Sequence, residues 1–185
     1  RQLTELINDL LDVSRLERGT MAFRPVRLDL RDAVRSGVEP LAALHPDQPL
    51  SLELPDQPVP VLADPTRLEQ VLANLLDNAI KYGAGAPVEV RLTVDAGRAL
   101  LCVSDHGPGI PADQQTRLFT RFFRAALPDK PGLGLGLYIS REIIKLHRGT
   151  IGVVSEPGRG ATFYFDLPLD EGAPLRTEKP ADDRA

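Results

Sequence analysis

Apolar residues recur at intervals of three and four along several stretches of the chain, with polar residues between them. This spacing places the apolar side chains on one face of an α-helix, so each stretch is predicted to be an amphipathic helix. The predicted helices cover residues 1–18, about 29–44, 65–82 and 137–147, with a shorter one near 113–119. Asp29 and Asp64 can cap the second and third helices, and Pro65 fits a first helical position.

Alternating apolar and polar residues predict β-strands between and after these helices. One alternating run extends from Val88 to Val94, and a second passes through Leu101 and Val103 after a turn at 96–98. Further short strands are predicted near residues 50–54, 59–62, 150–155 and 161–167. The chain has no internal repeat, which indicates one domain built from both kinds of element.

The composition supports one globular domain, because 42% of the 185 residues are hydrophobic and 26% are charged. A net charge of −4 gives no basic surplus for a nucleic-acid partner.

Residues 169–185 are predicted to be a disordered tail, because they are mostly polar and charged. Cys102 is the single cysteine, which excludes an internal disulfide and predicts a buried structural thiol. No apolar run is long enough to cross a bilayer, and a start at Arg1 without methionine indicates an excised fragment.

The third predicted helix carries a polar stripe formed by Asn74, Asn78 and Lys81. These positions are i, i+4 and i+7, so they lie on one face of the helix, while the apolar positions occupy the other. Amide oxygens beside a lysine suit a Mg²⁺ ion that also binds phosphates. The alternative is an ordinary solvated face of the helix.

A glycine-rich turn, Asp105 to Ile110, directly follows a predicted strand. A carboxylate at the end of a strand can accept a hydrogen bond from an exocyclic amine such as that of adenine. Gly107 and Gly109 would let the backbone approach a flat ring closely. The alternative is an ordinary turn of the kind that Asp and Gly favour.

A second glycine-rich segment, Gly132 to Leu137, leads directly into the last predicted helix. Exposed N–H groups and the helix dipole at such a position favour a bound phosphate. The alternative is a strained apolar turn.

Between the two glycine segments, residues 119–124 interleave three phenylalanines with Arg121 and Arg124. This pattern predicts either a core edge with surface charges or a mobile lid whose arginine reaches a phosphoryl group.

The order and spacing of these four segments are more specific than any one of them. Together they resemble the N, G1, F and G2 boxes of the histidine kinase catalytic domain and of the wider gyrase, Hsp90 and MutL ATPase family. Residues 158–162 resemble a further glycine box, and the resemblance spans about residues 29–168. It implies an α/β fold of the α+β two-layer sandwich type, in which a mixed β-sheet carries three main helices on one face (the Bergerat-type ATP-binding fold). The predicted helices and strands agree with this architecture.

The resemblance also implies ATP and Mg²⁺ as cofactors and assigns roles to individual residues. Asp105 is expected to contact the adenine amine, Asn78 to ligate Mg²⁺, and Tyr82 to lie beside the nucleotide. The residues expected to bind cofactor are Asn74, Asn78, Lys81, Tyr82, Asp105, Gly107, Gly109, Ile110, Gly132, Gly134, Leu135, Gly136, Leu137 and Thr162. The residues expected to act in catalysis are Asn74, Lys81 and Arg124, with Arg121 as a second candidate for the lid arginine.

One position on the third helix separates a kinase from an ATPase within the family. Gyrase-like members carry a glutamate, which activates the attacking water, four residues before the metal-binding asparagine. This chain has Asn74 there, and an amide is a very poor proton acceptor. Glu69 lies off the face that carries Asn78 and is a weak substitute. The helix is therefore predicted to bind MgATP without hydrolysing it efficiently.

Residues 10–17 resemble the end of the second helix of the dimerisation and phosphoacceptor domain of histidine kinases. The predicted parts are residues 1–18 from that helix, a linker at 19–28, the ATP-binding catalytic domain at 29–168 and the tail at 169–185. None of His45, His106 and His147 is followed by a phosphoacceptor motif, so the fragment is not expected to phosphorylate itself.

The expected partners are the phosphoacceptor domain of the parent kinase and a response regulator receiver domain, with no nucleic acid. The fragment is expected to be a monomer or weak dimer in the cytoplasm, whether the parent is an inner-membrane sensor or a soluble kinase.

Three alternatives stay open: an ATPase of the gyrase or Hsp90 type, a catalytically silent nucleotide-binding module, and a serine kinase of the anti-sigma type. Leu133 motivates the silent module, because it replaces the small polar residue common in the second glycine box.

Overall fold

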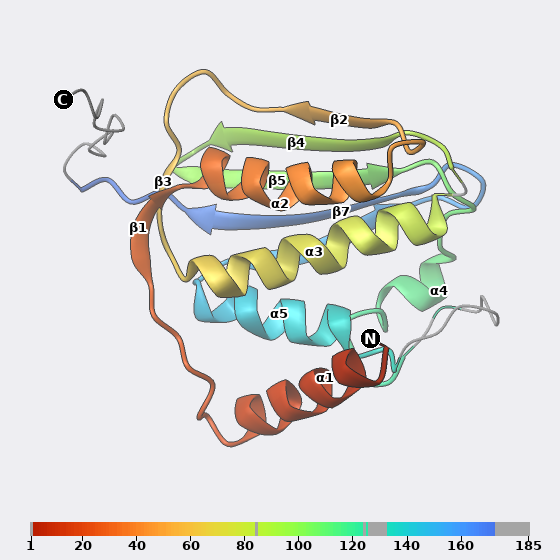
Figure 1. Cartoon of the computed structure of the whole chain (residues 1–185), viewed down its shortest axis with the longest axis horizontal. Coiled ribbons are helices and arrows are strands. Elements are labelled where there is room, and N and C mark those ends of the chain that lie inside the picture. Colours follow the sequence, from red (N-terminus) through yellow and green to blue (C-terminus); the bar gives the residue numbers. More distant parts are fainter. Residues whose placement is uncertain (1, 84, 124, 126–132, 173–185) are drawn as a thin grey trace, which may run out of the picture.

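A mixed β-sheet is the centre of the fold in the computed structural model, which describes residues 2–83, 85–123, 125 and 133–172. Its five strands are ordered β2-β4-β5-β7-β6 (Figure 1). They are β2 (Leu50–Glu53), β4 (Val88–Asp95), β5 (Arg98–Asp105), β6 (Thr150–Ser155) and β7 (Ala161–Pro168). The β2–β4 pair is parallel and the other three pairs are antiparallel. The predicted mixed sheet is therefore confirmed.

Three helices cover one face of this sheet, as predicted (Figure 1). They are α2 (Leu30–Leu44), α3 (Pro65–Tyr82) and α5 (Gly136–Leu146). The remaining elements are α1 (Gln2–Glu17), α4 (Ala112–Gln115) and a two-stranded sheet of β1 (Val26–Asp29) and β3 (Pro60–Ala63). None of the helices in the described ranges is both long and apolar enough to cross a membrane.

The core lies between the helical layer and the inward side of the sheet. Helix α3 contributes a stripe of six side chains with at most 1% exposure, namely Leu68, Val71, Leu72, Leu75, Leu76 and Ala79. Alternate residues of β5 and β7 meet them from the sheet, among them Leu101 and Phe165. Burying one large apolar side chain stabilises a fold by roughly 1.5–3 kcal/mol, so this stripe fixes the rotation of α3. The polar side of α3 then lies away from this core, and Asn74 on that side meets α5 at Ser140.

Both predicted N-caps are present. The Asp29 carboxylate accepts from the N–H of Arg31, and the Asp64 carboxylate accepts from the N–H of Arg67 at 3.2 Å. Asp64 also accepts from the N–H of Arg24 at 2.7 Å, which ties the linker to the start of α3. The two caps therefore fix where α2 and α3 begin, and the contact with Arg24 fixes the path of the linker into the domain.

Helix α1 folds back onto its own domain along one face and leaves another face exposed. Val13 is buried, and the buried carboxylate of Asp12 accepts from Gln70 Nε2 at 2.8 Å. On the opposite face the apolar side chains of Ile7, Leu10 and Leu11 are 46–49% exposed. The helix therefore docks on its own domain through one face, while the apolar stripe of the other face is without cover in the described chain.

Two expectations about single segments are corrected. Residues 169–172 are not part of a disordered tail, because the N–H of Leu169 donates to Gly97 O and Asp170 pairs with Arg27 at 2.8 Å. The rest of the predicted tail, 173–185, lies outside the described residues. Cys102 is half-buried rather than buried, because its β5 position faces away from the helices; even so, partial burial raises the pKa of its thiol.

His147 has a structural role that its sequence position did not reveal. Its ring is 4% exposed, and Nε2 accepts from the N–H of Asp64 at 3.0 Å. Because Nε2 accepts, Nδ1 carries the proton and donates to Ile143 O at 2.8 Å. Phe23 packs edge-on against the ring at 4.8 Å. The neutral imidazole thus joins the end of α5 to the start of α3 and to the linker.

Protonation of His147 is expected to destabilise the domain. Burial lowers its pKa in the folded chain below the ordinary value of about 6.5. Its contribution to the free energy of unfolding is therefore complete above that value and is lost as the pH falls toward the lowered folded pKa. We expect urea midpoints measured from pH 7.5 to pH 5 to fall less steeply for His147→Gln than for the unmutated chain. Parallel slopes would exclude this role.

Candidate functional site

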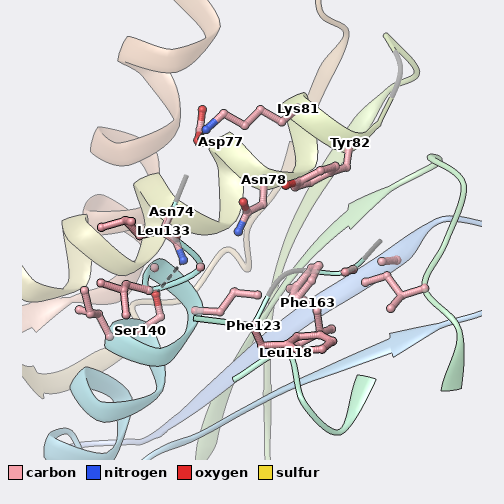
Figure 2. Close-up of a pocket in the computed structure, with 18 of the residues that line it drawn as sticks. Asn74, Asp77, Asn78, Lys81, Tyr82, Leu118, Phe123, Leu133, Ser140 and Phe163 are labelled. Carbon is pink, nitrogen blue, oxygen red and sulfur yellow. Dashed lines mark hydrogen bonds and ion pairs between the residues drawn. The ribbon is translucent and has the colours of Figure 1, made fainter. Parts of the chain in front are cut away.

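A cavity of about 900 Å³ opens between α3, the N-terminal end of α5 and the ends of β5 and β7 (Figure 2). This size suits a small-molecule ligand. Leu6 and Asp9 of α1 also line it, so the docked helix forms part of the wall. Leu118, Phe123 and Phe163 supply an apolar side.

The polar stripe of α3 lines the cavity, but its members do different things. Asn78 points its amide into the cavity, whereas Asn74 donates from Nδ2 to Ser140 Oγ of α5 at 3.0 Å (Figure 2). Lys81 lies at the rim, where Nζ is 2.5 Å from a carboxylate oxygen of Asp77. Both partners of this ion pair are about half exposed. In this arrangement the lysine is directed along the helix and not toward the cavity floor.

Asp105 ends β5 at one end of the cavity and is 6% exposed. Its Oδ1 accepts from the N–H of Gly107 at 2.9 Å and from that of Ala161 at 3.3 Å. Burial raises the pKa of this carboxyl, and the two backbone hydrogen bonds act in the opposite direction. Within the described part of the chain no hydrogen bond reaches Oδ2, so this oxygen is the acceptor that Asp105 can offer a ligand.

The glycines of this turn serve the packing of the chain more than the approach of a ring. A Cβ at Gly107 would lie 2.2 Å from Tyr82 O, and one at Gly109 would lie 2.1 Å from Glu156 O. Gly109 and Ile110 line the cavity, whereas Gly107 is not among its lining residues, and the expected part of Gly107 in binding the cofactor stays a prediction. Gly107 keeps the turn against the end of α3, where Tyr82 lines the cavity.

The N-terminus of α5 forms the other end of the cavity. Helix α5 begins at Gly136, one residue before its predicted start, and its N-cap residue Leu135 makes no side-chain cap. Among the described residues no side chain caps the first N–H groups of the helix, and such a helix N-terminus favours an anion. Gly134 to Leu137 line this end, whereas Gly132 lies outside the described residues.

Thr162 is the predicted site residue that the strand places elsewhere. Its hydroxyl lies 2.8 Å from Ser104 Oγ, its partner in the β5–β7 register. Alternate residues of a strand face opposite sides, so Ala161 and Phe163 line the cavity and Thr162 faces away from the helices. The expected contact with the base is therefore wrong for Thr162.

The segment between the two glycine turns is tied to neighbouring helices. Arg121 pairs with Glu17 of α1 and donates to the hydroxyl of Tyr138 at 2.8 Å. Its guanidinium also stacks 4.8 Å from the Tyr138 ring. In this state Arg121 does not reach the cavity, and Arg124, the first candidate for the lid arginine, lies outside the described residues.

Sequence reasoning missed several lining residues. Asp77 stands next to Asn78 in the sequence, and Ser140 lies one helical turn after Gly136, so helical spacing could have indicated both. Phe163 could have been found from strand alternation. Leu6 and Asp9 carried no such signal, because their place depends on how α1 docks.

Comparison with known proteins identifies the family that this chain resembles. Residues 63–171 match the family described as histidine kinase-, DNA gyrase B-, and HSP90-like ATPase. The sensor histidine kinase MtrB of Mycolicibacterium paratuberculosis is 36% identical over 93% of this chain and 31% of its own length. The probable sensor histidine kinase TcrY of Mycobacterium tuberculosis is 39% identical over 95% of this chain and 38% of its own length. The chain thus spans about a third of these relatives.

Solved structures show the same fold. The mycobacterial sensor histidine kinase MprB superposes with a TM-score of 0.71 at 31% identity, covering 78% of this chain and 98% of that structure. Full-length ShkA in complex with AMPPNP superposes with a TM-score of 0.77 at 31% identity, covering 94% of this chain and 37% of that structure.

Proposed function

The chain belongs to the family of histidine kinase-, DNA gyrase B- and HSP90-like ATPases, and from this premise we propose that it binds MgATP and donates the γ-phosphoryl group to a histidine on the phosphoacceptor domain of its parent sensor kinase. The phosphoryl group would then pass to an aspartate of a response regulator. The sensor histidine kinases that match nearly the whole chain support this proposal.

One observation carries the proposal: the cavity has a buried acceptor at one end and an anion site at the other. Asp105 offers Oδ2 to an exocyclic amine, and the uncapped N-terminus of α5 offers N–H groups to phosphates. Asn78 points into the space between them. An adenine nucleotide has its amine and its phosphates at opposite ends, which suits this polarity.

The donor set fits Mg²⁺. No cluster of three or more His, Cys, Asp or Glu side chains that could hold a metal occurs among the described residues. Mg²⁺ does not require one, since it keeps several waters and binds substrate phosphates together with one or two protein oxygens. We assign Asn78, with Asn74 beside it, as the residues that would hold the ion. When bound, the ion would neutralise charge on the phosphates.

The identity of residue 74 favours phosphoryl transfer over hydrolysis. The amide of Asn74 is bound to Ser140 and offers no basic group to activate water. Asp77 is the carboxylate of α3 closest in sequence to Asn74, and it forms an ion pair with Lys81 at the rim of the cavity. This supports a kinase whose nucleophile comes from another domain, and it makes the gyrase-type ATPase the less favoured alternative.

The exposed apolar stripe of α1 supports the remaining parts of the proposal. Ile7, Leu10 and Leu11 suit the second helix of a dimerisation and phosphoacceptor domain, whose partner helices would cover them. We propose a cytoplasmic location for this domain, as phosphotransfer from ATP requires, and a monomer or weak dimer for the chain alone.

Phosphotransfer can be tested by mixing the chain with γ-labelled MgATP and the separately produced phosphoacceptor domain of the parent. We expect acid-labile label on the acceptor histidine, and none on the chain alone. Asn78→Ala should reduce the transfer at least about tenfold, because the metal ion that binds the phosphates would lose a protein ligand. Rapid release of inorganic phosphate without labelled acceptor would instead identify an ATPase.

A further inference from the structure

The amide of Asn74 is held between two positions of α5 that lie one helical turn apart. Its Nδ2 donates to Ser140 Oγ at 3.0 Å, across 66 residues of sequence (Figure 2). On its other side, an added Cβ at Gly136 would lie 2.3 Å from Asn74 Oδ1. The carboxamide therefore lies directly against the first turn of α5, at the end of the cavity assigned to the phosphates.

Ser140 is a polar residue on an otherwise apolar, buried face. It is 2% exposed, and its neighbours on that face include Ile139, Ile143 and Ile144. A buried hydroxyl is unfavourable unless it is hydrogen-bonded, and an alanine would suit both the helix and its core-facing side. Among the described residues, the Ser140 hydroxyl makes its side-chain hydrogen bond with Asn74.

This contact holds the amide of Asn74 in one place against α5, with Nδ2 toward Ser140. An amide carries an acceptor oxygen on one side and a donor nitrogen on the other. Because Nδ2 is engaged by Ser140, Oδ1 is the atom that lies beside Gly136. An oxygen at this end serves a metal ion or its waters, whereas an NH₂ group would serve a phosphate oxygen. Without the hydroxyl, the amide would lose this partner on α5 and would be free to rotate.

We propose that Ser140 is a positioning residue for the nucleotide reaction: it fixes the carboxamide of Asn74 so that the oxygen faces the Mg²⁺ side of the site. The proposal rests on the proposed function, because it assumes that MgATP occupies the cavity. It also gives Asn74, expected from the sequence to bind cofactor and act in catalysis, a specific part as an oriented oxygen. In this proposal Ser140 acts through the hydrogen bond that it accepts from Asn74.

The test measures ATP affinity with Mg²⁺ and with excess chelator, so that the metal-dependent gain in affinity is the readout. Ser140→Ala should lower that gain by about tenfold, the effect of losing one hydrogen bond, and should change metal-free affinity less than about twofold. Ser140→Thr keeps the hydroxyl and should restore the gain. Ser104→Ala is the matched control, because it removes a serine hydroxyl that is hydrogen-bonded to Thr162 Oγ1 at 2.8 Å on the far side of the sheet. It should leave the gain unchanged.

If threonine does not fit the buried position of Ser140, a double-mutant cycle between Ser140 and Asn74 measures whether Ser140 acts through Asn74. In an Asn74→Ala background, Ser140→Ala should have no further effect on the metal-dependent gain. An equal loss of affinity with and without Mg²⁺ would show a merely structural role, and an undiminished effect in the Asn74→Ala background would show that Ser140 acts independently. Absence of ATP binding by the unmutated chain would overturn the proposed function as well; normal binding with an unchanged Ser140→Ala variant would overturn this inference alone.

Discussion

Asp105→Asn is expected to weaken ATP binding at least about a hundredfold while the domain stays folded. An asparagine has the shape of the aspartate, and its Oδ1 can still accept from the N–H groups of Gly107 and Ala161. Those two donors fix the orientation of the new amide. An NH₂ group then replaces Oδ2 and faces the exocyclic amine of adenine, so an attractive contact becomes a contact between two donors. A site built to hydrogen-bond its ligand rejects such a mismatch strongly.

The pKa of Asp105 makes the stability of this variant informative. Burial raises the pKa of the folded carboxyl, so its contribution to the free energy of unfolding is complete below the unfolded pKa and is lost as the pH rises through the folded pKa. At neutral pH the charged form is therefore a cost, and Asp105→Asn should melt no lower than the unmutated chain.

Calorimetric titration and thermal melting together check this prediction. Glu89→Gln is the matched control, because it also replaces a carboxylate by an amide, on the adjacent strand, but at a half-exposed position beside His106. It should keep its ATP affinity. If Asp105→Asn bound ATP as well as Glu89→Gln does, adenine recognition by Asp105 would be refuted.

Gly160→Ala is expected to destabilise the domain far more than Gly158→Ala does. Both glycines have positive φ, at 81° and 82°, so an alanine at either position is strained by about 1–2 kcal/mol. At Gly160 the new Cβ would also lie 2.0 Å from Asp105 O and 2.8 Å from His106 Cα, whereas at Gly158 nothing lies within 4 Å. These are backbone atoms of the nucleotide turn, which cannot rotate away. The clash should add roughly 1–3 kcal/mol.

Urea unfolding of the two variants isolates the clash, because the backbone strain is common to both. We expect a clearly lower midpoint for Gly160→Ala, together with weakened ATP binding, since relief of the clash must displace Asp105. Gly158→Ala should keep its affinity. Equal midpoints for the two variants would mean that β7 and the end of β5 are not packed as described.

The helices and strands were predictable because burial against one sheet imposes a simple period on each element. The six buried positions of α3 follow the helical period, and this placed Asn74 and Asn78 on the polar side. The cavity-lining role of Asp105 was predictable for a related reason, since it ends a strand and is followed by glycines.

The remaining features depend on contacts between distant segments. The wrong expectation for Thr162 arose because a motif gives the order of residues but not which side of β7 each one faces. The hydrogen bond from Asn74 to Ser140 and the docking of Asp12 on Gln70 each join elements more than fifty residues apart. Periodicity within one element carries no information about such pairs. The resting position of Arg121 against Tyr138 likewise depends on how α1 and α5 meet.

Calorimetric titration of the unmutated chain with ATP, in the presence and absence of Mg²⁺, tests most directly whether the cavity binds MgATP. We predict one site per chain, a measurable affinity without the metal from the contacts at Asp105 and the N-terminus of α5, and tighter binding when Mg²⁺ joins the amide oxygens of α3. No binding in either buffer, or binding of several nucleotides with no effect of Mg²⁺, would contradict it.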